Sequence, residues 1–256
     1  MKVVILAGGF GTRLREETEY RPKPMVQIGG RPILWHIMKS YAGYGHNDFV
    51  ICLGYRGGVI RDYFLDYETQ NRDFAITLGT GKVEVLGKHS EDGWQVTLAE
   101  TGEKTMTGGR LKRIDRYIGR STFMATYGDG VANVDLDALL SFHQDRGKLA
   151  TVTAVRPSSR YGELSIADGR VTLFQEKPQV NEGWINGGYF VFEPEVFKLI
   201  AGDEDTLETG LLGRLVETGE LAVYQHDGFW QCMDTYREMQ QLNELWDRGE
   251  APWKIW

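Results

Sequence analysis

Near its beginning the chain reads Val3-Val-Ile-Leu-Ala-Gly-Gly-Phe-Gly-Thr-Arg-Leu14. The first five residues of this stretch are apolar, and glycines follow them at once. Such a run is typical of a strand that is buried on both faces of a parallel sheet. Glycines after the strand let backbone N–H groups approach phosphate oxygens closely, because no Cβ atom intervenes. We therefore expect a phosphate-binding turn directly after a central strand.

Strand-like and helix-like segments alternate along the rest of the chain. Apolar residues recur at helical spacing from Ile33 to Tyr41, and Asp135 is a good N-cap for a helix that continues to His143. The other segments that we expect are strands at 49–53, 123–127, 151–155, 171–174 and 188–192, and helices at 59–64 and 236–245. This alternation predicts an α/β fold: a doubly wound, Rossmann-like, mixed and mainly parallel sheet flanked by helices. No linker or repeat interrupts the pattern, so we expect a single domain over residues 1–256.

The stretch from Asp73 to Gly109 has a different rhythm. Short β-type runs (Phe74–Leu78, Val83–Leu86 and Trp94–Leu98) alternate there with glycines. This pattern indicates a hairpin-rich excursion from the sheet. The excursion either covers the ligand cleft or decorates the surface, and the residues favour neither alternative.

Composition and charge restrict the classes of partner. The chain has 256 residues, a net charge of -7 and a pI near 5.4. General binders of nucleic acid or of membrane surfaces need a broad basic face, so both classes are disfavoured. No apolar run resembles a signal peptide or a membrane helix, and Cys52 and Cys232 alone make no disulfide framework. We expect a cytoplasmic protein with two buried free thiols.

Two basic residues accompany the glycine turn. Arg13 lies within it, and Lys23 stands between two prolines in Arg21-Pro-Lys-Pro-Met25. Arginine offers a planar fork to phosphate, and lysine offers a mobile point charge. The spacing fits neither the Walker pattern nor the dinucleotide-binding G-x-G-x-x-G pattern. No Gly-x-Ser-x-Gly segment supports acyl transfer. The combination predicts a site for a polyphosphate.

Two aspartates are candidate metal ligands. Asp129 lies in a glycine-flanked turn after an apolar strand, where ligands gather in open α/β sheets. Asp234 follows the aromatic pair Phe229-Trp230. Magnesium in proteins is commonly held by one or two carboxylates together with ligand phosphates. Each aspartate also has a local alternative: a turn residue that bonds its own backbone, or an N-cap of the last helix.

These motifs resemble those of the nucleotide-sugar pyrophosphorylase family. The fingerprint of that family is a glycine turn ending in Gly-Thr-Arg-Leu, followed by a Pro-Lys-Pro segment, and the resemblance covers nearly the whole chain. It implies transfer of a nucleotidyl group from a nucleoside triphosphate to a hexose 1-phosphate, with release of pyrophosphate. It also implies Mg²⁺ as the cofactor, held by Asp129 and Asp234.

The resemblance further implies roles for individual residues. Arg13, Lys23 and Asp129 would be catalytic. The nucleotide would be bound by Leu6, Ala7, Gly8, Gly9, Gly11, Thr12, Arg13, Lys23, Thr107, Gly108, Gly109, Arg110 and Gly128. The sugar phosphate would be bound by Tyr161, Gly162, Glu176, Lys177, Asn186 and Gly187. Within this set, the segment Thr107–Arg110 is expected to be a turn that reads the base.

Within the family, the chain looks most like the members that use CTP and glucose 1-phosphate. The matching segments include Pro32-Ile-Leu-Trp-His-Ile-Met, Met106-Thr-Gly-Gly-Arg-Leu-Lys-Arg and Phe229-Trp-Gln-Cys-Met-Asp-Thr. Arginine donates but cannot accept, so Arg110 alone does not separate cytosine from uracil. The same chemistry with UTP or dTTP, a nucleotide-sugar glycosyltransferase and a non-catalytic nucleotide sensor therefore remain as alternatives.

Relatives in this family are often oligomeric, so we expect a homo-oligomer that binds only small-molecule substrates. The tail Trp253-Lys-Ile-Trp256 is strongly aromatic. It packs either on its own domain or on a neighbouring subunit. His36 and His143 fall within helical patterns and are expected to be structural.

Overall fold

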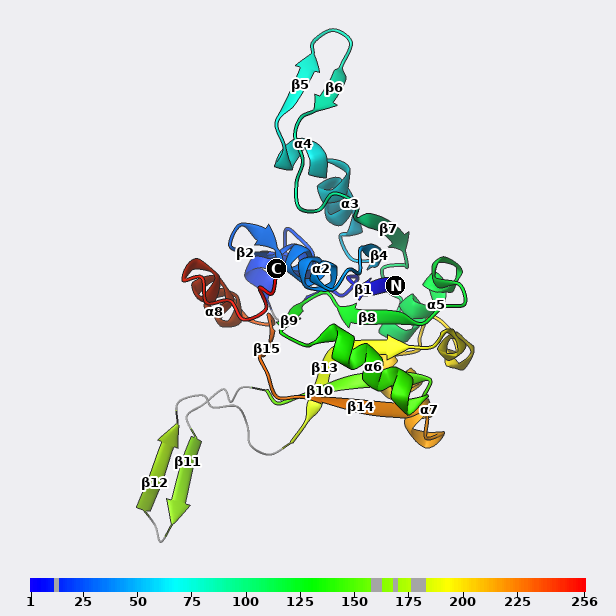
Figure 1. Cartoon of the computed structure of the whole chain (residues 1–256), viewed down its shortest axis with the longest axis vertical. Helices are drawn as coiled ribbons and strands as arrows, with labels where there is room; N and C mark the ends of the chain where they lie inside the picture. The colour runs from blue at the N-terminus through cyan, green and yellow to red at the C-terminus, as the bar shows by residue number, and fades with distance from the viewer. Residues whose placement is uncertain (12–13, 158–162, 168–169, 176–182) are drawn as a thin grey trace.

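The central sheet has seven strands in the order β14-β10-β13-β8-β1-β4-β7, and every strand except β13 runs in the same direction (Figure 1). The computed structural model describes residues 1–11, 14–157, 163–167, 170–175 and 183–256. The strands of the sheet are β1 (Lys2–Leu6), β4 (Asp48–Leu53), β7 (Gln95–Glu100), β8 (Phe123–Tyr127), β10 (Ala150–Val155), β13 (Ile185–Phe192) and β14 (Leu221–His226). The expected mixed, mainly parallel α/β sheet is confirmed.

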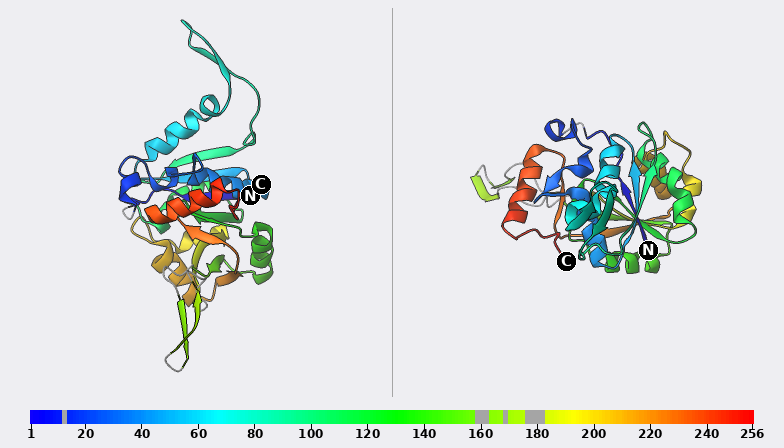
Figure 2. Two further views of the ribbon diagram at one scale, coloured as in Figure 1. Left: turned by 90° about the vertical axis from the view of Figure 1, so that its left-hand side faces the viewer. Right: turned by 90° about the horizontal axis from the view of Figure 1, so that it is seen from above.

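Helical segments flank the sheet on both sides, and the strands fan out in the right-hand view of Figure 2, as sheet twist requires. The helices are α1 (Arg15–Thr18), α2 (Ile33–Gly43), α3 (Gly57–Leu65), α4 (Tyr67–Asn71), α5 (Thr107–Ile118), α6 (Leu136–Arg146), α7 (Gly213–Glu217) and α8 (Tyr236–Asp247), with short turns η1 (Lys23–Met25), η2 (Pro194–Leu199) and η3 (Leu207–Leu212). As expected, the Asp135 side chain caps α6 by accepting from the N–H of Ala138. In the described part of the chain, none of the helices has the length and apolar character that crossing a bilayer requires.

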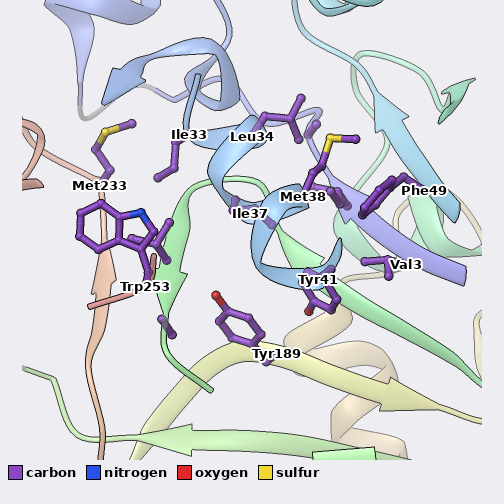
Figure 3. Packing of buried hydrophobic residues seen from close by; sticks show 14 of the residues in the cluster. Val3, Ile33, Leu34, Ile37, Met38, Tyr41, Phe49, Tyr189, Met233 and Trp253 are labelled. Atoms are coloured by element: carbon purple, nitrogen blue, oxygen red, sulfur yellow. The ribbon is translucent and has the colours of Figure 1, made fainter. Parts of the chain in front are cut away.

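Strand β1 separates two hydrophobic layers because its side chains alternate between the faces of the sheet. Val3 and Ile5 face the layer that contains α2, whereas Val4 and Leu6 face the layer that contains α5. Figure 3 shows the first layer, in which Ile37 and Tyr41 of α2 pack over the strands. Burial on both faces explains why the sequence of β1 is continuously apolar.

Four two-stranded pairs supplement the sheet. They are β2 (Gln27–Ile28) with β3 (Arg31–Pro32), β5 (Phe74–Thr77) with β6 (Lys82–Val85), β9 (Gly130–Ala132) with β15 (Trp230–Cys232), and β11 (Glu163–Ala167) with β12 (Arg170–Gln175). The β5–β6 hairpin extends from the body beyond α4 (Figure 1), so an excursion is present. The expectation that the excursion extends to Gly109 is wrong. Gln95–Glu100 instead forms the edge strand β7 beside β4, and α5 begins at Thr107. A short half-buried edge strand has the same sequence pattern as a hairpin strand.

The aromatic tail packs on its own chain. Trp253 is fully buried and stacks on Phe229, with ring centroids 5.6 Å apart. Its indole Nε1–H lies 3.3 Å from Nδ1 of His36, and Nε2 of His36 lies 2.8 Å from the carbonyl oxygen of Ile28. A neutral imidazole with its proton on Nε2 satisfies both contacts, because it donates to Ile28 and accepts from Trp253. Burial lowers the pKa of His36 to about 4.

This histidine makes stability depend on pH. The unfolded chain binds a proton at His36 near pH 6.5, whereas the folded chain does so only near pH 4. The contribution of neutral His36 to the free energy of unfolding should therefore be fully present above pH 6.5 and be lost as pH falls toward 4, up to about 3 kcal/mol. Urea unfolding of the wild type and of His36→Gln across this window measures the contribution. Equal pH slopes for the two proteins would contradict it.

Candidate active site

A cavity of about 380 Å³ opens at the carboxyl ends of β1 and β8. Parallel strands all end at this edge of the sheet, which is where open α/β proteins bind ligands. Of the residues that the sequence nominated, the following line the cavity: Leu6, Ala7, Gly8, Gly9, Gly11, Lys23, Thr107, Arg110, Gly128, Asp129 and Asp234. Segments far apart in the sequence therefore meet around one space. Among the described residues, none from the β5–β6 hairpin lines it.

The glycine turn is shaped by its neighbours. Gly11 has φ +62°, a left-handed conformation that side chains rarely adopt. The hydroxyl of Thr18 lies 2.9 Å from the carbonyl oxygen of Gly11 and 2.8 Å from that of Leu14, so its single proton is shared between these two acceptors. A Cβ on Gly8 would lie only 2.2 Å from Nη1 of Arg110. The glycine at position 8 is thus required by a close approach of a side chain.

Arg110 joins the ends of three strands. Its guanidinium donates to the carbonyl oxygens of Gly8, Leu53, Gly102 and Glu103 and to the hydroxyl of Thr101, at 2.7–3.2 Å. The side chain is buried, and burial lowers its pKa below the ordinary value. Buried donors need acceptors, and carbonyl dipoles supply them here. Arg110 therefore connects the segments that follow β1, β4 and β7.

The segment Thr107–Arg110 is the first turn of helix α5 rather than a free turn. Thr107 lies at the cavity, but Gly108 and Gly109 pack against another loop. A Cβ on Gly108 would lie 2.7 Å from the carbonyl oxygen of Asp205, and one on Gly109 would lie 2.6 Å from that of Asp203. Helix–loop packing is thus sufficient to explain both glycines.

Lys23 lies between the two aspartates. Its ammonium donates to Oδ2 of Asp129 at 2.6 Å and to Oδ1 of Asp234. Burial opposes the charge of Lys23, but the nearby carboxylates, above all Asp129, outweigh it and raise the pKa of Lys23 above its ordinary value. Lys23 remains charged at neutral pH and neutralises part of the carboxylate charge.

The pairing of β15 with β9 brings the aspartates together. Cys232 pairs with Gly130, and the N–H of Met233 donates to the carbonyl oxygen of Asp129 at 2.8 Å. Asp129 and Asp234 therefore flank the same end of this strand pair. The N-cap of α8 is Thr235, with Glu238 completing a capping box, so the N-cap role considered for Asp234 is wrong.

The donor set suits a divalent cation. One carboxylate oxygen from each aspartate and Sγ of Cys232 lie within 4.8 Å of one another. Carboxylate oxygens are hard ligands that fit Mg²⁺, whereas a thiol is not one of its preferred ligands. Burial raises the pKa of the Cys232 thiol, which therefore stays neutral. Cys52 is a buried free thiol as expected, while Cys232 is free but partly exposed.

Tyr127 is a cavity residue that the sequence did not nominate. Its hydroxyl donates to Oε1 of Glu208 at 2.6 Å and lies 3.4 Å from Nδ2 of Asn186. Oε2 of Glu208 accepts from the hydroxyl of Thr107 at 3.0 Å. This chain of contacts links the predicted sugar residue Asn186 to the predicted nucleotide residue Thr107. The position of Tyr127, directly before Gly128-Asp129 at the end of a strand, was the available signal.

Of the remaining nominated residues, those that the structure describes do not line the cavity, and the others lie outside the described residues. Gly187 follows Asn186 in β13, and its carbonyl oxygen accepts from Nε1–H of Trp230 at 2.7 Å. The residues outside are Thr12, Arg13, Tyr161, Gly162, Glu176 and Lys177. Phe10, Pro24 and the segment 103–106 also line the cavity and were not nominated.

Fold and site together define a nucleotidyltransferase: residues 2–235 match the Nucleotidyl transferase family model, and the chain belongs to that family. It is 51% identical, over 257 residues and 100% of both chains, to the glucose-1-phosphate cytidylyltransferase of Salmonella typhimurium. It is 30% identical over 238 residues to mannose-1-phosphate guanyltransferase 2 of Candida glabrata, across 90% of this chain and 60% of that protein. The crystal structure of HddC from Yersinia pseudotuberculosis has the same fold, with a TM-score of 0.70, 24% identity, and coverage of 96% of this chain and 99% of that one.

The contacts of Arg110 predict that replacing this residue lowers the stability of the fold. A lysine side chain would offer one compact ammonium in place of a planar fork, so Arg110→Lys leaves several buried carbonyl oxygens without a donor. We expect the free energy of unfolding to fall by about 2 kcal/mol or more. Arg113→Lys is the matched control, because Arg113 forms an exposed ion pair with Asp203. Denaturant unfolding measures the free energy of unfolding of both variants. If Arg110→Lys keeps the wild-type stability but binds nucleotide more weakly, Arg110 reads the base instead of stabilising the fold.

Proposed function

We propose that this chain transfers the cytidylyl group of CTP to α-D-glucose 1-phosphate and releases pyrophosphate. The observation that carries the proposal is the convergence of the glycine turn, Lys23 and the carboxylate pair Asp129–Asp234 on one cavity. The full-length identity of 51% with the Salmonella cytidylyltransferase supports CTP and glucose 1-phosphate as the substrates.

The cavity meets the main difficulty of this reaction, which is repulsion between two polyanions. Backbone N–H groups of Gly8–Gly11 can approach phosphate oxygens, and the ammonium of Lys23 supplies positive charge beside them. Arg13, at the end of the same turn, would stabilise the departing pyrophosphate, and Lys177 would hold the sugar phosphate. Positioning and charge neutralisation are the larger part of catalysis in phosphoryl chemistry.

Asp129 and Asp234 would hold Mg²⁺ at the α-phosphate. The bound ion would neutralise charge on the phosphate oxygens during attack. No enzyme nucleophile is needed, because the sugar phosphate carries an anionic oxygen that can attack the α-phosphorus in line with the leaving pyrophosphate. The new bond joins that oxygen to the α-phosphorus, and the bond from the α-phosphorus to the oxygen that bridges the α- and β-phosphates breaks. Pyrophosphate leaves with the electron pair of the broken bond, so no further reactant is needed.

The hexose would lie beyond Tyr127, toward Asn186 and Gly187. Asn186 can both donate to and accept from sugar hydroxyls, and its Oδ1 already accepts from the N–H of Gly188 at 2.8 Å. Tyr161, Gly162 and Glu176 would complete this side. Thr107 and Arg110 would lie on the nucleotide side with Gly128, as the cavity lining suggests.

One assay tests the reaction and its rivals. Pyrophosphate release is measured for CTP, UTP, dTTP, ATP and GTP, each with glucose 1-phosphate, mannose 1-phosphate and galactose 1-phosphate. We expect the highest kcat/KM for CTP with glucose 1-phosphate, and loss of activity in EDTA that Mg²⁺ restores. Sugar transfer from a nucleotide sugar without pyrophosphate release would assign a glycosyltransferase instead. Binding of nucleotide without turnover would assign a sensor.

We also infer that the chain assembles with copies of itself through the β5–β6 hairpin. Both faces of this hairpin are open to solvent, although Phe74, Ile76 and Val83 are apolar and 43–51% exposed. An isolated two-stranded hairpin is marginally stable in water, and clustered exposed apolar side chains commonly mark interfaces. A second copy of the chain would cover these side chains.

Charged substitutions on the hairpin test this assembly. The double variant Ile76→Asp/Val83→Asp should shift the molar mass in solution, measured by light scattering, from an oligomer to the monomer of 29.0 kDa. Val216→Asp is the control, because Val216 is equally apolar and 64% exposed but lies on α7. A monomeric wild type, or an oligomer that persists in the double variant, would contradict the inference.

A further inference from the structure

The ammonium of Lys23 occupies the position that a metal ion shared by Asp129 and Asp234 would need. Nζ lies 2.6 Å from Oδ2 of Asp129 and hydrogen-bonds to Oδ1 of Asp234. The Lys23 side chain is only 9% exposed, so this contact is enclosed and weakly screened by solvent. The three charged groups come from η1, from the end of β8 and from the end of β15.

Lysine and metal cannot occupy this space together. The potential metal-ligand atoms of the carboxylate pair and of Cys232 all lie within 4.8 Å of one another. Oxygen ligands lie about 2.1 Å from a bound Mg²⁺, so an ion shared by both carboxylates would fill the space between them. It would also repel the ammonium strongly, because both are cations in a partly buried site.

We propose that Lys23 is an internal counter-ion that keeps the metal position filled in the free enzyme and must leave it when the metal enters. The inference rests on the proposed metal-binding role of Asp129 and Asp234. It assigns Lys23 a second role beside phosphate binding: it sets the affinity of the free enzyme for divalent cations.

The surroundings allow the side chain to move while its backbone stays in place. Lys23 is flanked by Pro22, which caps the turn η1, and by Pro24 within η1, and the N–H of Met25 donates to the carbonyl oxygen of Pro22 at 2.8 Å. The ammonium, in contrast, is at the end of a flexible stem and faces the cavity. The glycine turn lies on the same cavity, and a Cβ on Gly11 would be 3.2 Å from Cβ of Lys23.

A triphosphate on the glycine turn would give the displaced ammonium a new anionic partner. Metal binding without nucleotide removes Lys23 from two carboxylates and leaves it unpaired, whereas binding with nucleotide exchanges one ion pair for another. Metal and triphosphate should therefore bind with positive coupling, and each should bind weakly alone.

The test measures metal binding without turnover. Mn²⁺ is the probe, because it prefers the same oxygen ligands and its free concentration is measured by electron paramagnetic resonance. Without nucleotide, Lys23→Met and the polar but uncharged Lys23→Gln should bind Mn²⁺ at least about tenfold more tightly than the wild type. Mn²⁺ should also raise the melting temperature of these variants more than that of the wild type.

Two controls identify the position of the ion. Lys39→Met removes another buried lysine that is paired with a carboxylate, that of Glu91 at 3.2 Å, and should leave Mn²⁺ affinity unchanged. Adding Asp234→Asn to Lys23→Met should abolish the gain. Unchanged or weaker Mn²⁺ binding by both folded Lys23 variants overturns the proposal, as does a gain that survives Asp234→Asn.

The wild-type assay with CTP and glucose 1-phosphate separates this outcome from failure of the proposed function. Pyrophosphate release together with no gain in the Lys23 variants overturns the counter-ion role alone. Absence of pyrophosphate release overturns the proposed reaction, whatever the Lys23 variants bind.

Discussion

Two carboxylates that share a small, partly buried space repel each other, and a cation between them removes this cost. In this chain the cation is the ammonium of Lys23, which forms ion pairs with Asp129 and Asp234. The ion triad joins the turn that follows the glycine loop to the ends of β8 and β15. The shape of the cavity depends on it, because these segments form one side of the space in which the substrates would meet.

Arg110 has the corresponding role on the other side of the glycine turn. Its buried guanidinium is held by carbonyl dipoles at the ends of β1, β4 and β7 rather than by a carboxylate. Carbonyl acceptors satisfy the buried N–H donors of the guanidinium without a carboxylate in direct contact. The guanidinium also explains Gly8 and Gly54, since a Cβ at either position would lie within 2.5 Å of Nη1.

The sequence predicted the strands β1, β4, β8, β10 and β13 and the helices α2, α3, α6 and α8, but it missed α5 and β14. Continuous apolar runs identified β1, β4 and β8, and the capped pattern after Asp135 identified α6, because burial and capping leave local signatures. Gln95–Glu100 belongs to the sheet and not to the excursion that its sequence predicts, because its pairing with β4 is a long-range contact that a short run does not encode. The resemblance implies a turn at Thr107–Arg110, whereas the structure places this segment in the first turn of α5, and packing against residues 203–206 accounts for its two glycines.

By itself the sequence determined a strand followed by a glycine turn, a lysine between prolines, and an α/β alternation. It also determined an aspartate after an apolar strand and a second aspartate after an aromatic pair. These features are local, and short-range sterics and hydrophobic periodicity make them predictable from the sequence. Only the tertiary structure decided that β15 pairs with β9, that Lys23 therefore lies between Asp129 and Asp234, and that Trp253 is buried against its own chain. Such contacts join residues up to 217 positions apart, and their geometry arises from packing of the whole sheet rather than from any local pattern.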